Sequence, residues 1–101
     1  MLKSAVIAAT IFAATTTANA CDPSSAAGLY RFYDKACTKL PSDFLTAVNK
    51  AAAGMDADVK DALASEQASY DAAPNEYCSN NAKPVAMAIA YYRKHKGASC
   101  L

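Results

Sequence analysis

Apolar residues recur at spacings of three and four positions through most of the chain after residue 20, which is the pattern of helices that bury one face. No segment shows the strict apolar–polar alternation of a half-buried strand. Caps and breakers divide the pattern into four parts. We therefore expect an all-α fold, a small disulfide-stapled bundle of about four helices that run up-down-up-down, as a single domain over residues 21–101.

The first helix has clear signals at both ends. Asp22 is a favourable N-cap residue, and Pro23 suits the first helical position, where no N–H is needed. Pro41 should stop the helix near residues 39–40, because a proline disfavours helical geometry in the residue before it. The apolar stripe of this helix comprises Ala26, Leu29, Tyr30, Tyr33, Ala36, Cys37 and Leu40.

Two helices are expected between residues 42 and 70, separated at Gly54. Ser42 is the expected N-cap of the second helix, and Gly54 suits the residue just beyond its end. Asp56 can then cap a third helix that reaches about Tyr70, followed by a turn over residues 71–75. The apolar positions of these two helices are Phe44, Leu45, Val48, Ala51, Ala52, Val59, Ala62, Leu63 and Tyr70.

The fourth helix is predicted over residues 82–96. Residues 78–81, with the sequence Cys-Ser-Asn-Asn, are expected to form a loop before it. Pro84 would then fall in the first helical turn, where its missing N–H has no cost. Gly97 should end the helix, and its apolar stripe consists of Val85, Ala88, Ile89 and Tyr92.

The first 20 residues have the composition of a secretory signal peptide. Lys3 precedes an apolar stretch over residues 5–14, and Ala18-Asn19-Ala20 matches the small-residue cleavage pattern. The apolar stretch is shorter than the ~20 residues that span a bilayer. Cleavage would leave Cys21 as the first mature residue, which raises lipid anchoring as an alternative. The alanine at position 18, where bacterial lipoproteins usually carry leucine, argues against lipid anchoring.

The chain without this segment differs from the full chain in length and net charge. The full chain has 101 residues with 10 Lys+Arg and 9 Asp+Glu, so the mature 81 residues (101 minus 20), without Lys3, carry 9 positive and 9 negative charges. A net charge of zero gives no electrostatic case for nucleic-acid binding. The expected location is periplasmic or secreted, and a eukaryotic secreted origin stays open.

Four cysteines, Cys21, Cys37, Cys78 and Cys100, all lie in the mature part, which indicates a disulfide framework. Each of two helices separates a cysteine pair by more than the ~7 Å that a disulfide allows, which excludes the 21–37 and 78–100 pairs. If the chain reverses at Gly54, the pairs are Cys21–Cys100 and Cys37–Cys78. If residues 42–70 form one unbroken helix, the pairs become 21–78 and 37–100. We predict the reversal and the first pairing.

Few residues are candidates for catalysis or metal binding. His95, the only histidine, sits among Arg93, Lys94 and Lys96, and no motif supplies a nucleophile or an orienting acid for it. Asp56, Asp58 and Asp61 lack the further ligands and the glycine of a calcium loop, and no cysteine spacing suits zinc. We therefore expect no catalytic residue, no metal and no cofactor.

Aromatic and basic residues remain as candidates for binding. Tyr30, Tyr33, Tyr70 and Tyr92 fall on the apolar stripes and are expected in the core. Tyrosines outside the core are typical of protein interfaces, because they combine apolar area with a hydroxyl group. The candidate binding residues off these stripes are Phe32, Tyr77, Tyr91, Arg93 and Lys94.

No motif identifies a family. The leading interpretation is a small exported, non-catalytic protein-binding module, such as an inhibitor, an immunity protein or a chaperone-like protein. Its partner would be another envelope or secreted protein, with at most peripheral membrane contact and no nucleic acid. The alternatives are an envelope-acting toxin or an accessory protein of secretion or conjugation, and a small enzyme.

Overall fold

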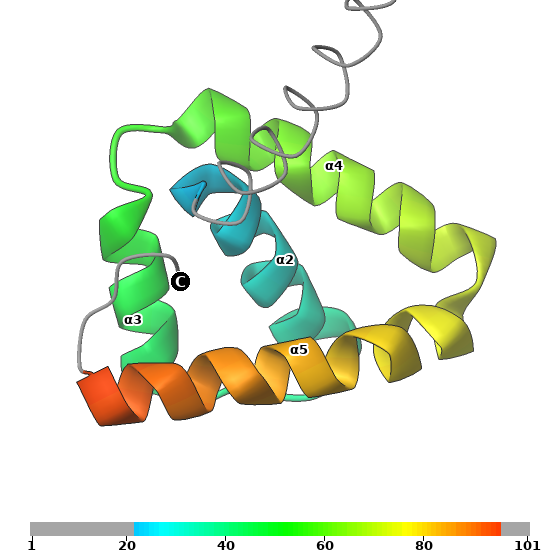
Figure 1. The fold of residues 1–101 in the computed structure, drawn as a ribbon. Coiled ribbons are helices and arrows are strands. Elements are labelled where there is room, and N and C mark those ends of the chain that lie inside the picture. Colours follow the sequence, from blue (N-terminus) through cyan, green and yellow to red (C-terminus); the bar gives the residue numbers. More distant parts are fainter. Residues whose placement is uncertain (1–21, 96–101) are drawn as a thin grey trace, which may run out of the picture.

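The computed structural model describes residues 22–95, which form four helices (Figure 1). These are α2 (Pro23–Ala36), α3 (Ser42–Ala51), α4 (Asp56–Ala72) and α5 (Pro74–His95). α2 lies in the middle of the molecule, between the other three helices, and packs most extensively against α4 (Figure 1). The predicted all-α fold is confirmed, whereas the predicted signal peptide, Cys21 and Cys100 lie outside the described residues.

The predicted N-cap of α2 is confirmed. The Asp22 carboxylate accepts hydrogen bonds from the Ser24 N–H at 3.2 Å, the Ser24 hydroxyl at 3.0 Å and the Ser25 hydroxyl at 2.9 Å. These bonds, that of the Ser25 hydroxyl first, hold the pKa of Asp22 below its usual range. Asp22 and Pro23 thus mark the start of α2 through local interactions.

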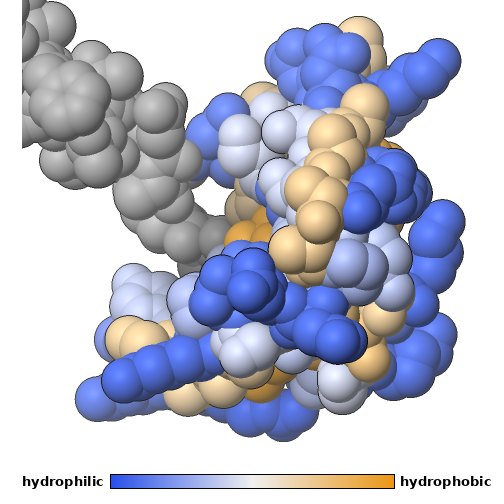
Figure 2. Space-filling view, turned by 90° about the vertical axis from the view of Figure 1, so that its right-hand side faces the viewer, coloured by the Kyte–Doolittle hydropathy of each residue, from blue (hydrophilic) through white to orange (hydrophobic). Residues whose placement is uncertain are grey.

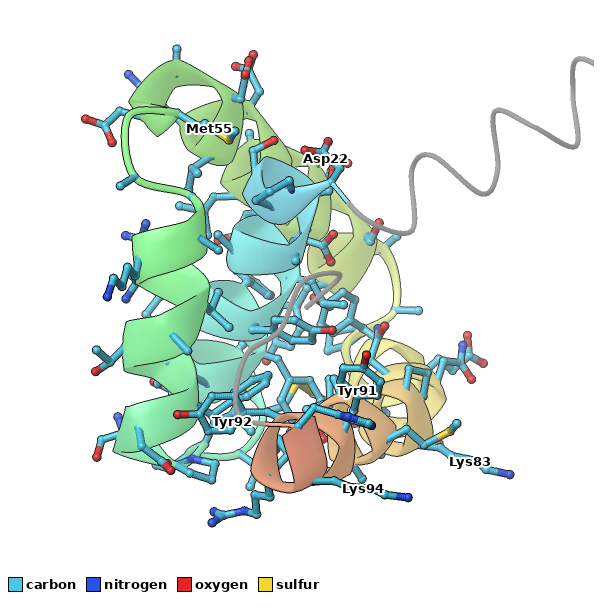
Figure 3. The ribbon with its side chains drawn as sticks, turned by 60° about the vertical axis from the view of Figure 1, so that its left-hand side comes forward. Asp22, Met55, Lys83, Tyr91, Tyr92 and Lys94 are labelled. Carbon is cyan, nitrogen blue, oxygen red and sulfur yellow. A yellow bond between two sulfur atoms is a disulfide. The ribbon has the colours of Figure 1, made fainter. Side chains whose placement is uncertain are left out.

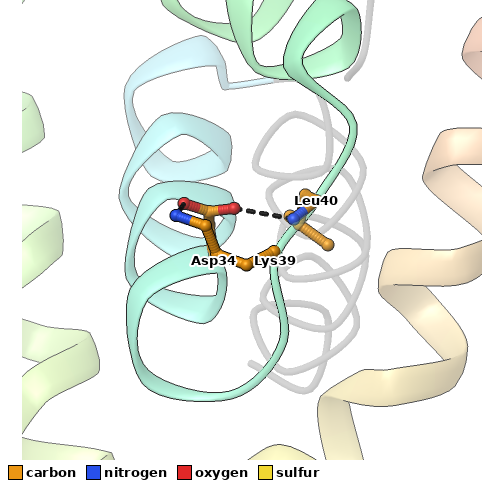
Figure 4. A network of polar contacts seen from close by, with 3 residues as sticks. All are labelled: Asp34, Lys39 and Leu40. Atoms are coloured by element: carbon orange, nitrogen blue, oxygen red, sulfur yellow. Dashed lines mark hydrogen bonds and ion pairs between the residues drawn. The ribbon is translucent and has the colours of Figure 1, made fainter.

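α2 ends at Ala36, earlier than the predicted stop near residues 39–40. The Asp34 carboxylate accepts a hydrogen bond from the Leu40 N–H at 2.6 Å and lies 3.5 Å from the Lys39 ammonium (Figure 4). An aspartate can satisfy backbone donors outside a helix, so it competes with continued helix formation. Asp34 therefore turns the chain before Pro41 is reached.

The break between α3 and α4 occurs at Gly54, as predicted. Gly54 has a φ of +85°, in the region that glycine adopts without a Cβ penalty. The two expected N-caps are wrong, because Ser42 and Asp56 are the first helical residues. Pro41 and Met55 occupy the cap positions, and neither can supply a side-chain cap. Asp56 still benefits from its place at the positive end of the helix dipole.

α5 begins at Pro74, so the predicted loop over residues 78–81 is wrong. Pro74 suits the first helical position, and the Tyr77 N–H donates to the Ala73 carbonyl at 2.8 Å to close the first turn. The turn between α4 and α5 is reduced to Ala73. Pro84 lies inside the helix, and in the turn before it the Asn81 side-chain amide donates to the Tyr77 carbonyl at 2.8 Å.

The core is built around aromatic contacts of α2 with its neighbours. Tyr30 of α2 packs edge-on against Phe44 of α3, with ring centroids 5.0 Å apart, and Phe44 also meets Tyr92 of α5 at 5.9 Å. Among the described residues, Phe44 and Val48 are the largest fully buried side chains. The buried apolar set is Ala27, Tyr30, Phe32, Tyr33, Phe44, Val48, Ala52, Val59, Tyr77 and Val85.

The predicted disulfide between Cys37 and Cys78 is present, with Cα atoms 5.6 Å apart. It joins the residue after α2 to the second turn of α5. The reversal at Gly54 brings these two cysteines to the same end of the fold, as the first predicted pairing requires. The 21–78 and 37–100 pairs are thereby excluded, because Cys37 and Cys78 are bonded to each other.

No helix within residues 22–95 combines the length and apolar character needed to cross a bilayer. The side of the molecule where α4 meets α5 is covered largely by polar side chains, with smaller apolar areas between them (Figure 2). The Cys37–Cys78 disulfide is compatible with an exported protein.

Candidate functional site

The outer face of α5 carries the large apolar side chains that stay exposed among the described residues. Met87 is 61% exposed and Tyr91 is 47% exposed. Lys83, Met87 and Tyr91 follow at intervals of one helical turn, and Lys94 comes three residues after Tyr91, so the four share one face. We call Lys83, Met87, Tyr91 and Lys94 the α5 strip.

The orientation of α5 explains why, within residues 22–95, Met87 and Tyr91 are exposed. Val85 is buried, and Tyr92 lies on the side of the helix toward α3, where it contacts Phe44 (Figure 3). Lys83 and Lys94 point outward from the helix (Figure 3). The buried residues therefore lie on one side of α5. The opposite side carries, in order along the helix, a basic, two apolar and a basic side chain. Solvent-exposed ammonium groups flanking two apolar side chains suit contact with a surface that carries carboxylates beside an apolar hollow.

The ring of Tyr91 stacks on the His95 imidazole, with centroids 4.2 Å apart and planes tilted by 34°. This contact at a spacing of four residues restricts the tyrosine side chain, so less freedom is lost when a partner orders it. His95 thus supports Tyr91, and no acid or nucleophile of the described chain is hydrogen-bonded to it.

Arg93, another predicted binding residue, is exposed but lies on a different side of α5. It comes two residues after Tyr91, and residues two apart on a helix do not face each other. Of the five predicted binding residues, the structure brings together Tyr91 and Lys94. Met87 and Lys83 join them, although the sequence reasoning did not single them out. Met87 precedes Tyr91 by one helical turn and Lys83 precedes it by two, so the spacing in the sequence already placed them on one face.

Phe32 was expected at the surface, and that expectation is wrong. Its side chain is 4% exposed and packs edge-on against Tyr70 and Tyr77, with centroids 5.5 Å away in both cases. The apolar stripe used for the prediction describes a helix with one buried face. α2 is central and contacts α3, α4 and α5, so a second side of it is buried as well.

Tyr77 was also expected at the surface and is 6% exposed. Its hydroxyl donates a hydrogen bond of 2.6 Å to the Glu66 carboxylate of α4. Burial and then this contact raise the pKa of Tyr77 far above its usual range. Tyr77 and Glu66 therefore tie α5 to α4 and are not available to a partner.

The Tyr77 hydroxyl should affect stability in a pH-dependent way. The folded state favours the protonated phenol, so its contribution is fully present below the pKa of an unfolded tyrosine, near 10, and is lost as the pH rises above it. We expect Tyr77→Phe to lower the free energy of unfolding by ~1–2 kcal/mol at pH 7. Between pH 9 and 11 its stability should fall less steeply than that of the unsubstituted chain. Urea titrations at several pH values test this, and equal slopes would contradict it.

Charge is distributed unevenly between α4 and α5. α4 carries Asp56, Asp58, Asp61, Glu66 and Asp71 against one cation, Lys60. After Glu76, α5 has no acidic residue, while it carries Lys83, Arg93 and Lys94. The near-neutral net charge of the full chain, +1, therefore conceals an acidic helix and a basic one, and the α5 strip lies on the basic helix.

The described residues show no arrangement for metal chemistry, since no three His, Cys, Asp or Glu side chains gather into a possible metal site. Asp56, Asp58 and Asp61 are exposed near the start of α4, where they favour the helix dipole. Comparison with protein-family models, with curated proteins and with solved structures finds no match to this chain.

Proposed function

We propose that this chain is a small exported, non-catalytic protein that binds another envelope or secreted protein through the α5 strip. The observation that carries the proposal is the exposure of Met87 and Tyr91 one turn apart on the same helix. Aromatic residues and methionine are enriched in protein interfaces, whereas the core of a soluble domain would normally bury them.

Export is part of the proposal. Cleavage after Ala20 would deliver a chain beginning at Cys21 to an oxidising compartment, in keeping with the Cys37–Cys78 disulfide. N-terminal sequencing of the exported protein tests this. A mature N-terminus at Cys21 without a lipid supports it, and a retained leader in the folded protein would contradict it.

The partner surface can be described from the strip. An apolar pocket would take the Met87 and Tyr91 side chains, and carboxylates at its rim would pair with Lys83 and Lys94. Most of the affinity should come from the two apolar side chains, because exposed ion pairs contribute only ~0–1 kcal/mol. The lysines should instead speed association at low salt.

A photo-crosslinking amino acid at position 91 tests the partner. We expect a specific cross-linked protein when the full chain is expressed and exported, and none when the same group replaces Lys50 on α3. Binding of the purified partner should weaken at least tenfold in a Met87→Ser/Tyr91→Ser variant. A Lys50→Gln/Lys60→Gln variant, changed at exposed positions outside the strip, should bind within twofold of the original. The proposal would be contradicted by cross-links of equal yield at positions 91 and 50, or by unchanged affinity of the Met87→Ser/Tyr91→Ser variant.

A further inference from the structure

A second feature of the surface is lined by no residue of α5. An open groove of about 460 Å³ lies between α2, α3 and α4. Its apolar floor takes one residue from each helix, the half-buried Leu45 and Leu63 and the buried Phe32. The volume falls within the ~300–1,000 Å³ of small-molecule sites.

One side of this groove is strongly cationic. Arg31 and Lys35 lie one turn apart on α2, both exposed, and Lys39 follows in the connection to α3. Within the described residues, neither Arg31 nor Lys35 forms an ion pair. Two cations one turn apart, beside an apolar floor, can bind an anion whose remainder is apolar.

The one carboxylate in the groove is already engaged. Asp34 accepts the Leu40 N–H at 2.6 Å and pairs with Lys39 at 3.5 Å (Figure 4). Its side chain is only 16% exposed, whereas that of Lys39 is 87% exposed. The carboxylate of Asp34 thus balances the charge of Lys39, while the positive charges of Arg31 and Lys35 have no counter-charge among the residues that line the groove.

We infer that the groove binds a single-chain amphiphile with an anionic head, such as a fatty acid or an alkyl phosphate. The guanidinium of Arg31 is suited to two parallel hydrogen bonds with a carboxylate or phosphate, and Lys35 adds a second positive charge. The alkyl chain lies along Leu45 and Leu63, the two half-buried apolar residues of the floor. This site uses none of the α5 strip, so it stands or falls independently of the proposed function.

The inference is tested by NMR titration of the oxidised, ¹⁵N-labelled mature chain with three ligands that share a ten-carbon chain, all below micelle formation. Decanoate and decyl phosphate carry anionic heads, and decyl maltoside is uncharged. Saturable amide shifts centred on Leu45, Asn49 and Leu63 are expected with an anionic ligand, and the arm that binds more tightly identifies the head group. The uncharged ligand should bind at least tenfold more weakly.

Variants of matched charge complete the test. Arg31→Gln/Lys35→Gln should weaken binding at least tenfold, while Lys50→Gln/Lys60→Gln should change it less than twofold. All four positions are exposed, and circular dichroism checks that each variant is folded. In the titrations, the inference is overturned if decyl maltoside binds as tightly as the anionic ligands, if neither anion gives a saturable shift, or if the shifts are confined to α5. Equal losses of affinity in the two variants would also overturn it. So would an oligoglutamate peptide that binds more tightly than either anionic amphiphile.

Discussion

Replacing both Cys37 and Cys78 with serine is expected to lower the free energy of unfolding by about 4 kcal/mol. The disulfide closes a loop with a sequence separation of 41 residues, and cross-linking so long a segment removes much conformational freedom from the unfolded chain. A single domain of this size has a net stability of only ~5–15 kcal/mol. Urea unfolding of the oxidised chain and the variant measures the difference.

The loss should be concentrated in α5. α2 packs far more extensively against α4 than against α5, so the bond supplies a large part of the link between α2 and α5. Hydrogen exchange should therefore show a greater loss of protection in α5 than in α2 and α4. A Cys37→Ala/Cys78→Ala pair is the control for introducing hydroxyl groups at half-buried positions. A loss below 1 kcal/mol in both pairs would contradict the assigned role of the bond.

The α5 strip links this prediction to the proposed function. Met87 and Tyr91 lie nine and thirteen residues beyond Cys78, on the part of α5 held by Val85 and by the contact of Tyr92 with Phe44. Loosening of α5 would disorder the strip without changing its residues. Weaker partner binding by the serine pair, recovered at low temperature, would distinguish this effect from loss of a direct contact.

Local signals in the sequence were sufficient to predict features that depend on a residue's own backbone or on its immediate neighbours. Asp22 caps α2 through side-chain hydrogen bonds to its neighbours, and Gly54 takes a positive φ that other residues disfavour. Once the chain reverses at Gly54, the end of α2 and the start of α5 lie at the same end of the fold, which pairs Cys37 with Cys78. These features needed no knowledge of the tertiary structure.

Other features depended on contacts that hydrophobic periodicity does not report. The early end of α2 follows from the Asp34 carboxylate meeting the Leu40 N–H six residues later, and buried Tyr77 pairs with Glu66 on the neighbouring helix. Phe32 has an aromatic partner on α4 and another on α5. A periodicity argument treats each helix as a cylinder with one buried side, so it could not place residues on the second buried side of α2.

The same limit applies to the candidate sites. The exposure of Tyr91 and Lys94 could be predicted because they lie off the buried stripe of α5. The cationic groove could not, because Phe32, Leu45 and Leu63 come from three helices whose packing the sequence does not specify. Part of the candidate strip on one helix could therefore be predicted from the sequence, while the groove between three helices could not.

Gly28→Ala is expected to destabilise the protein by ~1–3 kcal/mol, although alanine is the better helix former by ~1 kcal/mol. Gly28 lies in the middle of α2, where it is buried against α4. A Cβ at this position would overlap the Ala62 Cβ and lie 3.0 Å from the Ala62 carbonyl carbon. The obstacle is partly backbone, so a rotamer change cannot relieve it, and α2 and α4 would have to separate.

A double-mutant cycle separates this clash from the effect of each change alone. Ala62→Gly should itself cost ~1 kcal/mol through its lower helix propensity. In the Gly28→Ala/Ala62→Gly chain the overlapping Cβ atoms are exchanged, so the loss should be less than the sum of the two single losses by at least ~1 kcal/mol. Urea unfolding of the four proteins gives the coupling. Strict additivity, or a Gly28→Ala chain more stable than the original, would show that α2 and α4 do not cross closely at this point.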